Sequence, residues 1–358
     1  MPSPRLHSNA AAGLQPGTSV LVAMSGGVDS SVAAALLKQA GLNVFGAHMI
    51  CWDECDWKEE RRDALRVALQ LEIPFSSFDF RAGYRERVFD YMIREYAEGK
   101  TPNPDVMCNR EIKFDLFLEK AKELRIDYIA TGHYARLDHD GPHPVLSEAL
   151  DKSKDQSYFL WAVEPRQLGR CLFPLGDYTK DEVRQIARSL GLPTAEKKDS
   201  QGLCFVGKVD FGYFLRGYLP RQEGIVANSR GDILGKHDGV AFYTIGQRHG
   251  LAIGGRVPYY VAEKKLDANT LIVGEGADDP VLFKSAIRVH RLNWLSDFRS
   301  GNCDVRIRYR QPRVPAVVVE EENGGVRVVF AKPQRGVAPG QSAVFYSHER
   351  LLGGGVIL

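Results

Sequence analysis

The feature that most constrains the fold is a glycine pair between a short apolar run and a helical stretch. Residues 18–23 are typical of a buried strand, and residues 31–37 are typical of a helix that ends at Gly41. Two adjacent glycines let the backbone curl tightly and turn its N–H groups inward. The helix start adds a positive dipole end and N–H donors without a partner inside the helix. The sequence therefore predicts a phosphate-binding loop, made of Ala23, Met24, Ser25, Gly26, Gly27, Val28, Asp29 and Ser30.

This loop fits neither of the common nucleotide-binding motifs. It lacks the lysine of GxxxxGK(S/T) and the third glycine of GxGxxG. Its order, Ser-Gly-Gly-Val-Asp-Ser, resembles the pyrophosphatase loop of the ATP-pyrophosphatase family. That resemblance implies cleavage of ATP between the α- and β-phosphates and transfer of AMP to a carbonyl-type oxygen. The alternative is a turn in which the glycines serve backbone geometry only.

Strand-like runs alternate with helical stripes through the first half of the chain. The strand-like runs are residues 43–50, 73–80 and 127–131, and the helical stripes are residues 57–71, 84–92 and 112–124. A capping box at residues 179–182 opens another helix. Strands separated by helices predict a parallel sheet, with ligands beyond the carboxyl ends of the strands. The phosphate loop and residues 131–133 both follow strands at that edge.

The second half reads as mostly β structure. Short β-like runs fall at residues 224–226, 241–244, 259–261 and 270–273, and a compact antiparallel barrel is expected from the runs at residues 304–309, 316–320, 326–330 and 342–346. The sequence thus predicts a phosphate-loop catalytic domain at residues 1–207, a small β-rich central domain at residues 208–278 and a C-terminal β-barrel at residues 279–358.

The overall composition says more about the cellular compartment of the protein than about its function. The chain has 358 residues and a formal net charge of +2, so any surface for nucleic acid must be local. Six cysteines in a chain of this length do not suggest a disulfide framework. No apolar run has the length of a membrane span, and residues 1–17 do not resemble a signal peptide. We expect a cytoplasmic protein without a membrane partner.

The last domain carries a local basic stretch. Alternation along residues 306–310 places three arginines on one face of an expected strand. Such a face suits a phosphate backbone. A merely solvated face is the alternative.

Two cysteines stand out by their context. Cys108 lies just before an expected helix, where the dipole favours the thiolate, and Asp105 is placed to shuttle a proton. Cys204 lies in a polar loop. For each, a small buried hydrophobe is the alternative. Cys51 and Cys55 have the spacing of half a metal site without a partner pair, so a structural role is favoured and no protein metal site is expected.

Motifs along nearly the whole chain resemble, in order, the tRNA-specific 2-thiouridylase family. They are residues 25–30, 103–114, 131–136, 154–160, 199–205 and 243–250. The resemblance implies an ATP-dependent sulfurtransferase that uses Mg²⁺, adenylates the C2 oxygen of the tRNA wobble uridine and replaces it with sulfur. The implied partners are tRNAs of the lysine, glutamate and glutamine type and an upstream persulfide donor protein.

The resemblance also implies roles for individual residues. The phosphate loop holds ATP, with Asp29 near Mg²⁺, and Met49 and Gly132 border the nucleotide. Cys204 carries the persulfide, Cys108 is the partner thiol that closes a disulfide with it, and Asp105 is the general acid or base. The residues implied to face the target uridine or to contact tRNA are Asn103, Pro104, Asp105, His133, Lys154, Asp155, Gln156, Arg308, Tyr309 and Gln341.

Two other functions stay open at this point. An ATP-pyrophosphatase ligase that adenylates a small carboxylate would need neither cysteine nor a basic barrel. A tRNA-binding module with a degenerate nucleotide loop would not need an intact Ser-Gly-Gly-Val-Asp-Ser.

Overall fold

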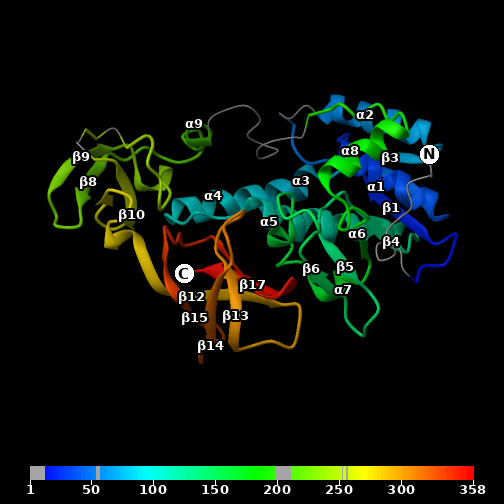
Figure 1. Cartoon of the computed structure of the whole chain (residues 1–358). Helices are drawn as coiled ribbons and strands as arrows, with labels where there is room; N and C mark the ends of the chain where they lie inside the picture. The colour runs from blue at the N-terminus through cyan, green and yellow to red at the C-terminus, as the bar shows by residue number, and fades with distance from the viewer. Residues whose placement is uncertain (1–12, 54–56, 199–210, 252, 255–256) are drawn as a thin grey trace. The chain divides into compact units, whose positions relative to one another are not determined.

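The computed structural model describes residues 13–53, 57–198, 211–251, 253–254 and 257–358 (Figure 1). The chain divides into two compact units. The first takes the described residues of Met1–Val88, Asp105–Gly207 and Ser347–Gly353, and the second takes those of Phe89–Pro104, Lys208–Tyr346 and Gly354–Leu358. The three domain boundaries expected from the sequence stay a prediction.

A five-stranded parallel sheet forms the centre of the first unit, with the strand order β3-β2-β1-β4-β7. Its strands are β1 (Ser19–Ala23), β2 (Asn43–Ile50), β3 (Phe75–Asp79), β4 (Tyr128–Ala130) and β7 (Cys171–Leu172). β1 lies in the middle, and Val20, Leu21 and Val22 are each at most 1% exposed. A run buried on both faces is what a central parallel strand requires. The predicted α/β class is confirmed.

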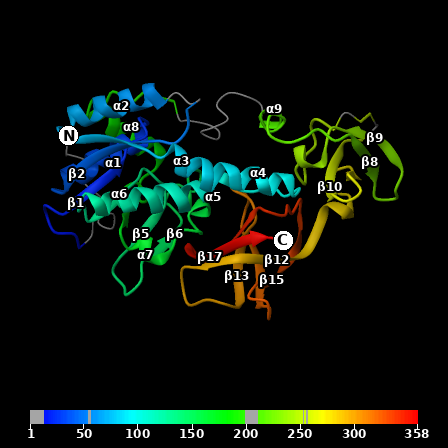
Figure 2. The same cartoon turned by 180° about the vertical axis from the view of Figure 1, so that it is seen from behind.

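Three helices share one buried apolar cluster with one face of this sheet. They are α1 (Val28–Gln39), α2 (Trp57–Gln70) and α8 (Lys180–Ser189), seen from behind in Figure 2. The cluster joins Val20 and Val44 of the strands to Leu36, Val67 and Val183 of the helices. The small side chains of residues 33–35 let α1 lie close to its neighbours, and the contacts between α1 and α8 depend on this.

Shorter helical elements connect the strands. They are α3 (Arg81–Tyr84), the π-helical η1 (Arg85–Phe89), α4 (Asp90–Ala97), α5 (Pro104–Cys108), the π-helical η2 (Asn109–Leu116), α6 (Phe117–Glu123), the 3₁₀ turn η3 (Ser157–Phe159) and α7 (Pro165–Leu168). A hairpin that the sequence did not predict, β5 (Arg136–Asp138) and β6 (Val145–Ser147), belongs to the first unit, whereas α4 belongs to the second.

The second unit begins its β structure with a four-stranded sheet in the order β10-β11-β8-β9. The elements here are α9 (Phe211–Leu215), β8 (Gly224–Asn228), β9 (Ile233–His237), β10 (Tyr259–Lys265) and β11 (Thr270–Glu275). The strand expected at residues 241–244 is wrong, because Val240–Phe242 forms a 3₁₀ turn, η4. Val240 and Tyr243 pack into the apolar cluster of this sheet from the turn, which explains the apolar run without a strand.

The C-terminal strands close into a six-stranded antiparallel barrel, as predicted. The order β12-β15-β14-β13-β16-β17 returns to β12 through a further β12–β17 pairing. The 3₁₀ turn η5 (Pro280–Leu282) precedes the barrel strands β12 (Phe283–Trp294), β13 (Gly301–Arg306), β14 (Val314–Glu320), β15 (Val326–Arg335), β16 (Ser342–Ser347) and β17 (Arg350–Ile357).

The prediction that residues 306–310 place three arginines on one strand face is wrong. β13 ends at Arg306, so Arg308 and Arg310 lie in the turn that follows it. Arg310 has a φ of +64° there, which strand geometry does not allow. The period-two alternation therefore does not place these arginines on a common strand face.

Among the helices of the described part of the chain, none has both the length and the apolar character needed to cross a bilayer.

Candidate active site

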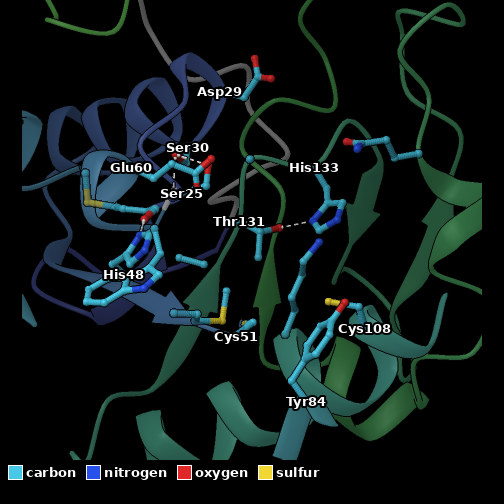
Figure 3. Close-up of a pocket in the computed structure, with 17 residues that line it drawn as sticks. Ser25, Asp29, Ser30, His48, Cys51, Glu60, Tyr84, Cys108, Thr131 and His133 are labelled. Carbon is cyan, nitrogen blue, oxygen red and sulfur yellow. Dashed lines mark hydrogen bonds between the residues drawn. The ribbon is translucent and has the colours of Figure 1, made fainter. Parts of the chain in front are cut away.

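A cavity of about 280 Å³ opens at the carboxyl ends of β1, β2 and β4, as a parallel sheet predicts (Figure 3). Many residues expected at the site line it. They are Ala23, Met24, Ser25, Asp29, Ser30, Met49, Cys108, Gly132, His133 and Gln156. The structure thus brings phosphate-loop residues and one of the two predicted thiols together within the first unit.

The hydroxyls of the phosphate loop largely hold the loop itself. The Ser30 hydroxyl donates to the Gly27 carbonyl at 3.2 Å and accepts from the Ser25 N–H at 3.2 Å. The buried Ser31 hydroxyl donates to the same carbonyl at 2.7 Å and accepts from Thr194 at 3.0 Å. Only Ser25 of these serines is exposed, so its hydroxyl is the one best placed to reach a ligand.

Two glycines of the site leave no room for a side chain. Gly26 has a φ of +77°, and a Cβ there would lie 2.2 Å from the Glu60 carbonyl oxygen. A Cβ on Gly132 would lie 2.7 Å from the Ser30 backbone nitrogen. Backbone therefore packs on backbone at both positions, which fixes the phosphate loop against α2 and against the loop after β4.

His48 supports the first residue of the loop from β2. Its Nδ1 lies 3.0 Å from the Met24 carbonyl oxygen, and since a carbonyl only accepts, Nδ1 carries the proton. Burial lowers the pKa of His48, so the ring is neutral near pH 7.

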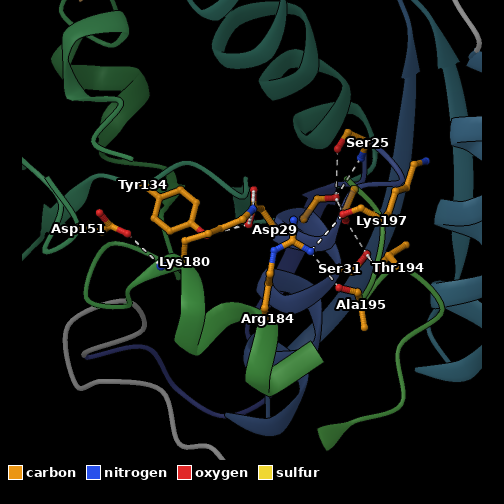
Figure 4. Close-up of polar contacts among 12 residues, drawn as sticks. Ser25, Asp29, Ser31, Tyr134, Asp151, Lys180, Arg184, Thr194, Ala195 and Lys197 are labelled. Atoms are coloured by element: carbon orange, nitrogen blue, oxygen red, sulfur yellow. Dashed lines mark hydrogen bonds and ion pairs between the residues drawn. The ribbon is translucent and has the colours of Figure 1, made fainter. Parts of the chain in front are cut away.

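Asp29 has two neighbours that the sequence did not indicate (Figure 4). Lys180 Nζ lies 2.7 Å from Asp29 Oδ1 and 2.8 Å from Oδ2, and the Tyr134 hydroxyl donates to Oδ1 at 2.8 Å. The Lys180 ammonium also lies 5.8 Å from the centre of the Tyr134 ring. The carboxylate is thus held by one cation and one hydroxyl.

Cys108 lines the cavity, but the physical reason given for its reactivity is wrong. The helix begins at Pro104, and Cys108 is the last residue of α5, immediately before η2. The effect of a helix dipole fades beyond the first turn, so it does not favour the thiolate here. Lys113 of η2 lines the same cavity, and a positive charge close to a thiol is what favours its thiolate.

His133 is a buried, neutral histidine at the same cavity. Its Nδ1 lies 2.7 Å from the Thr131 hydroxyl, and its ring packs against Phe114 and Phe173. Burial, with a smaller contribution from the Lys113 charge, holds the pKa of His133 well below 6.5. At 7% exposure, it meets a ligand only inside the cavity.

Asp105 does not line the cavity within the described residues, although its carboxyl responds to the same lysine. Surrounding protein raises the pKa of Asp105 from 3.8, and the Lys113 charge opposes the rise. Because Asp105 is exposed, water reaches the carboxyl and we expect the rise to be small.

Residues 154–156, which the resemblance implies to contact tRNA, differ in their exposure and contacts. Asp155 is 3% exposed, and its carboxylate accepts from the Ala149 N–H and from the backbone and hydroxyl of Ser157. It therefore fixes the loop rather than presenting itself to a ligand. Gln156 lines the cavity and accepts from the Tyr134 N–H, and Lys154 is half-buried.

The remaining first-unit expectations concern cysteines. Cys204 and Cys55 lie outside the described residues. Cys51 lines the cavity, which its spacing with Cys55 did not predict.

In the second unit, Gln341 holds the loop that carries Asn103 and Pro104. Its Nε2 donates to the Thr101 carbonyl at 2.8 Å and lies 3.3 Å from that of Pro102. The Thr101 N–H donates to the Pro339 carbonyl at 2.8 Å. Gln341 is thus bound to protein backbone, which gives it a structural task beside the implied contact with tRNA.

Arg308 is likewise engaged with backbone. Its Nη2 donates to the Ile245 carbonyl at 3.0 Å and to the Gly336 carbonyl. Arg308 and Tyr309 are both half-buried, whereas Arg310 is exposed and stacks 5.2 Å from the Tyr309 ring centre.

Within the described residues, no three or more His, Cys, Asp or Glu side chains gather in a way that would hold a metal ion. Mg²⁺ is commonly bound by one or two carboxylates together with substrate phosphates, and Asp29 at the phosphate loop fits that pattern.

The site residues that sequence reasoning missed are mostly polar side chains from distant segments. They are His48, Cys51, Glu60, Tyr84, Lys113, Tyr134 and Lys180. One feature of the sequence could have indicated Lys180. A lysine at the first position of a helix opposes the helix dipole, which suggests a role outside the helix.

Known proteins match this chain along nearly all of its length. A family model described as a tRNA methyl transferase HUP domain matches residues 18–208, a PRC-barrel model of the same series matches residues 212–275, and an aminomethyltransferase β-barrel model matches residues 284–357. The tRNA-specific 2-thiouridylase MnmA 2 of Geobacillus kaustophilus is 47% identical over 351 residues, which are 95% of this chain and 94% of that protein. The chain belongs to the tRNA-specific 2-thiouridylase family.

A second relative in this 2-thiouridylase family supports the assignment. The tRNA-specific 2-thiouridylase MnmA of Hahella chejuensis is 48% identical over 352 residues, covering 94% of this chain and 96% of that one. Among solved structures, the NMN synthetase of Francisella tularensis is similar at 16% identity with a TM-score of 0.36, covering 55% of this chain and 71% of that one. A likeness at that level carries no argument about function.

The close approach at Gly26 gives a test of the loop. Gly26→Ala should lower the free energy of unfolding by about 3 kcal/mol, because the added Cβ meets a backbone oxygen at a positive φ. Gly27→Ala is the matched control, since its Cβ would meet only the Ser25 hydroxyl at 3.5 Å. Denaturant unfolding measures both. Equal losses in the two variants would contradict the packing described.

The buried neutral His133 predicts a pH dependence. Its pKa is depressed in the folded state, so its stabilising contribution is present above pH 6.5 and is lost as the pH falls below that value. Between pH 6.5 and about pH 5, the wild type should lose up to about 1.4 kcal/mol per pH unit more than His133→Gln. Identical slopes would mean that His133 takes up a proton as readily in the folded as in the unfolded chain.

Proposed function

We propose that this chain is a tRNA-uridine 2-sulfurtransferase, which uses ATP to replace the C2 oxygen of the wobble uridine with sulfur. The observation that carries the proposal is one cavity lined by both the phosphate loop and Cys108. A thiol next to a nucleotide site suits sulfur transfer, whereas a ligase of small carboxylates has no use for it.

ATP binds at the carboxyl edge of the sheet. The backbone of residues 24–30 and the start of α1 face its phosphates, and Met49 and Gly132 border the nucleotide. Asp29 would hold Mg²⁺ together with phosphate oxygens, and the ion when bound would neutralise charge on the leaving pyrophosphate.

The first step activates the oxygen that has to leave. The uridine C2 oxygen attacks the α-phosphorus of ATP, the bond between the α-phosphorus and the bridging oxygen breaks, and pyrophosphate departs with the electron pair. The C2 oxygen then belongs to an AMP ester and becomes a good leaving group. Donors of the phosphate loop act on the charge that develops on the phosphates.

The second step places sulfur at C2. The terminal sulfur of a persulfide on Cys204 attacks C2, and the C2–O bond breaks as AMP leaves. The Cys108 thiolate then attacks the Cys204 sulfur, the S–S bond to the new thiocarbonyl breaks, and a Cys108–Cys204 disulfide forms. A thiol reductant restores both thiols, and a persulfide donor protein reloads Cys204.

Cys108, Cys204 and Asp105 are the proposed catalytic residues. Asp105 acts as general acid or base for the uridine, and the Lys113 charge favours the thiolate of Cys108. Neutral His133 contacts the substrate inside the cavity rather than at an outer RNA surface.

The tRNA reaches this chemistry only if the wobble base leaves its stack, as base-modifying enzymes require. Asn103 and Pro104 are proposed to face the extruded uridine, on the loop that Gln341 holds. Further proposed tRNA contacts are Lys154, Gln156, Arg308, Tyr309 and Gln341, and buried Asp155 holds the loop that carries Lys154 and Gln156. We also propose that the chain has the three predicted domains and a cytoplasmic location. The proposed substrates are tRNAs of the lysine, glutamate and glutamine type.

The direct test is reconstitution. The protein, ATP, Mg²⁺, a persulfide donor protein loaded with sulfur, a thiol reductant and unmodified tRNA should yield 2-thiouridine, as seen by nucleoside mass analysis, together with AMP and pyrophosphate. Cys108→Ser should lower turnover at least about 100-fold while AMP formation persists, because activation precedes sulfur transfer. Asp29→Asn should instead abolish AMP formation. Thiolation by Cys108→Ser at the wild-type rate would contradict the thiol role.

A methyltransferase is the second candidate, because residues 18–208 match a domain family named after tRNA methyl transferases. It would need a methyl donor rather than ATP cleavage, and it would not depend on Cys108. The mass of the modified nucleoside separates replacement of oxygen by sulfur from addition of a methyl group.

The basic turn after β13 predicts part of the RNA surface. Arg310→Ala should reduce the dependence of tRNA affinity on salt by about one unit of slope, because an exposed cation then no longer displaces a counterion. Arg230→Ala is the control, since that guanidinium is paired with Asp232 and Glu275. An unchanged slope for Arg310→Ala would place the RNA surface elsewhere.

A further inference from the structure

Lys180 occupies a position that helix stability does not explain. It is the first residue of α8 and is 8% exposed, so its charge is both desolvated and placed against the helix dipole. The capping box of Thr179 and Glu182 starts the helix without it. A role outside α8 is therefore needed to account for this lysine.

The side chain of Lys180 reaches Asp29 (Figure 4). Its ammonium bonds both carboxylate oxygens, at 2.7 and 2.8 Å, above the Tyr134 ring. Its backbone N–H donates to Asp151 at 3.0 Å, which fixes the start of α8. Asp29 lines the cavity and Lys180 does not, so Lys180 reaches the ligand through Asp29.

In the absence of a divalent cation, a lone carboxylate in a phosphate loop works against its ligand. Asp29 lies in the first turn of α1, where the helix dipole and the loop N–H groups attract anions. An uncompensated negative charge there would repel the phosphates of a nucleotide. The paired ammonium cancels that charge, and the two-point contact holds the carboxylate in one orientation.

We propose that Lys180 is a positioning residue for a nucleoside triphosphate, and that it acts by neutralising and orienting Asp29 so that the phosphate loop accepts the phosphate chain. This inference rests on the proposed function, because it assumes that the loop binds ATP. The loop lacks the lysine that common phosphate loops carry, and the compensating charge comes instead from a helix 151 residues further along the chain.

The test compares variants that remove one or both charges of the Asp29–Lys180 pair. Calorimetry on the full chain, without divalent cations, measures the affinity of each variant for inorganic pyrophosphate. Lys180→Met should weaken binding about tenfold or more, and Asp29→Asn should strengthen it, because each leaves the partner charge uncompensated. The double variant Asp29→Asn with Lys180→Met should return to within about twofold of the wild type. Lys180→Arg should retain most of the affinity, since it keeps the charge.

The double variant keeps the test valid where a single variant fails to fold, because it buries no unpaired charge. Double-variant binding as weak as that expected of Lys180→Met would overturn the proposal, since Lys180 would then contact phosphate directly. Unchanged binding by Lys180→Met would overturn it as well.

Lys152→Met is the matched control, because it breaks another 2.7 Å ion pair of the same unit, to Glu349, without touching the cavity. Absence of pyrophosphate and ATP binding by the wild type would instead contradict the proposed function.

Discussion

The structure depends on one close approach of backbone to backbone, between Gly26 and the Glu60 carbonyl at the start of α2. No side chain fits between them, so the loop after β1 can curl only with glycine at this position. That curl directs the N terminus of α1 toward the cavity, and Gly132 then packs on the Ser30 nitrogen from β4. Three strand ends are thereby brought to one place, where a nucleotide and a thiol can meet.

Charge compensation is the second constraint on the same site. His48 and His133 are buried and neutral. Asp29 is paired with Lys180, and Asp105 is exposed near Lys113. Because Asp29 is already paired with Lys180, binding of a highly charged nucleotide does not have to overcome an uncompensated carboxylate in the loop.

The sequence predicted what depends on local pattern. The phosphate loop, the parallel sheet and the terminal barrel follow from glycine spacing and alternating strand and helix periods, which act over a few residues. The site residues Met49 and Gly132 came from family resemblance, and the structure places both at the cavity. Pattern failed where tertiary packing decides. Residues 241–244 form no strand, because Val240 and Tyr243 pack into a core from the 3₁₀ turn η4 and the residue after it, and Cys108 lies inside a helical run because Pro104 begins it.

The contacts that the sequence could not show join residues far apart in the chain. Lys180 meets Asp29 across 151 positions, and Gln341 meets Thr101 across 240. Neither pairing leaves a periodic trace, so only the fold reveals them. The contacts of Arg308 could not be read from the sequence either. The basic stretch around it suggested an RNA surface, and the structure shows that its guanidinium also donates to two backbone carbonyl groups.

The central claim is that the C2 oxygen of uridine leaves the nucleobase as part of AMP. Transcribed tRNA carrying a heavy oxygen isotope at uridine C2 tests it most directly, with mass analysis of the AMP released during thiolation. The account predicts one heavy oxygen in each AMP that is formed together with a 2-thiouridine. AMP without the label, alongside normal formation of 2-thiouridine, would contradict it.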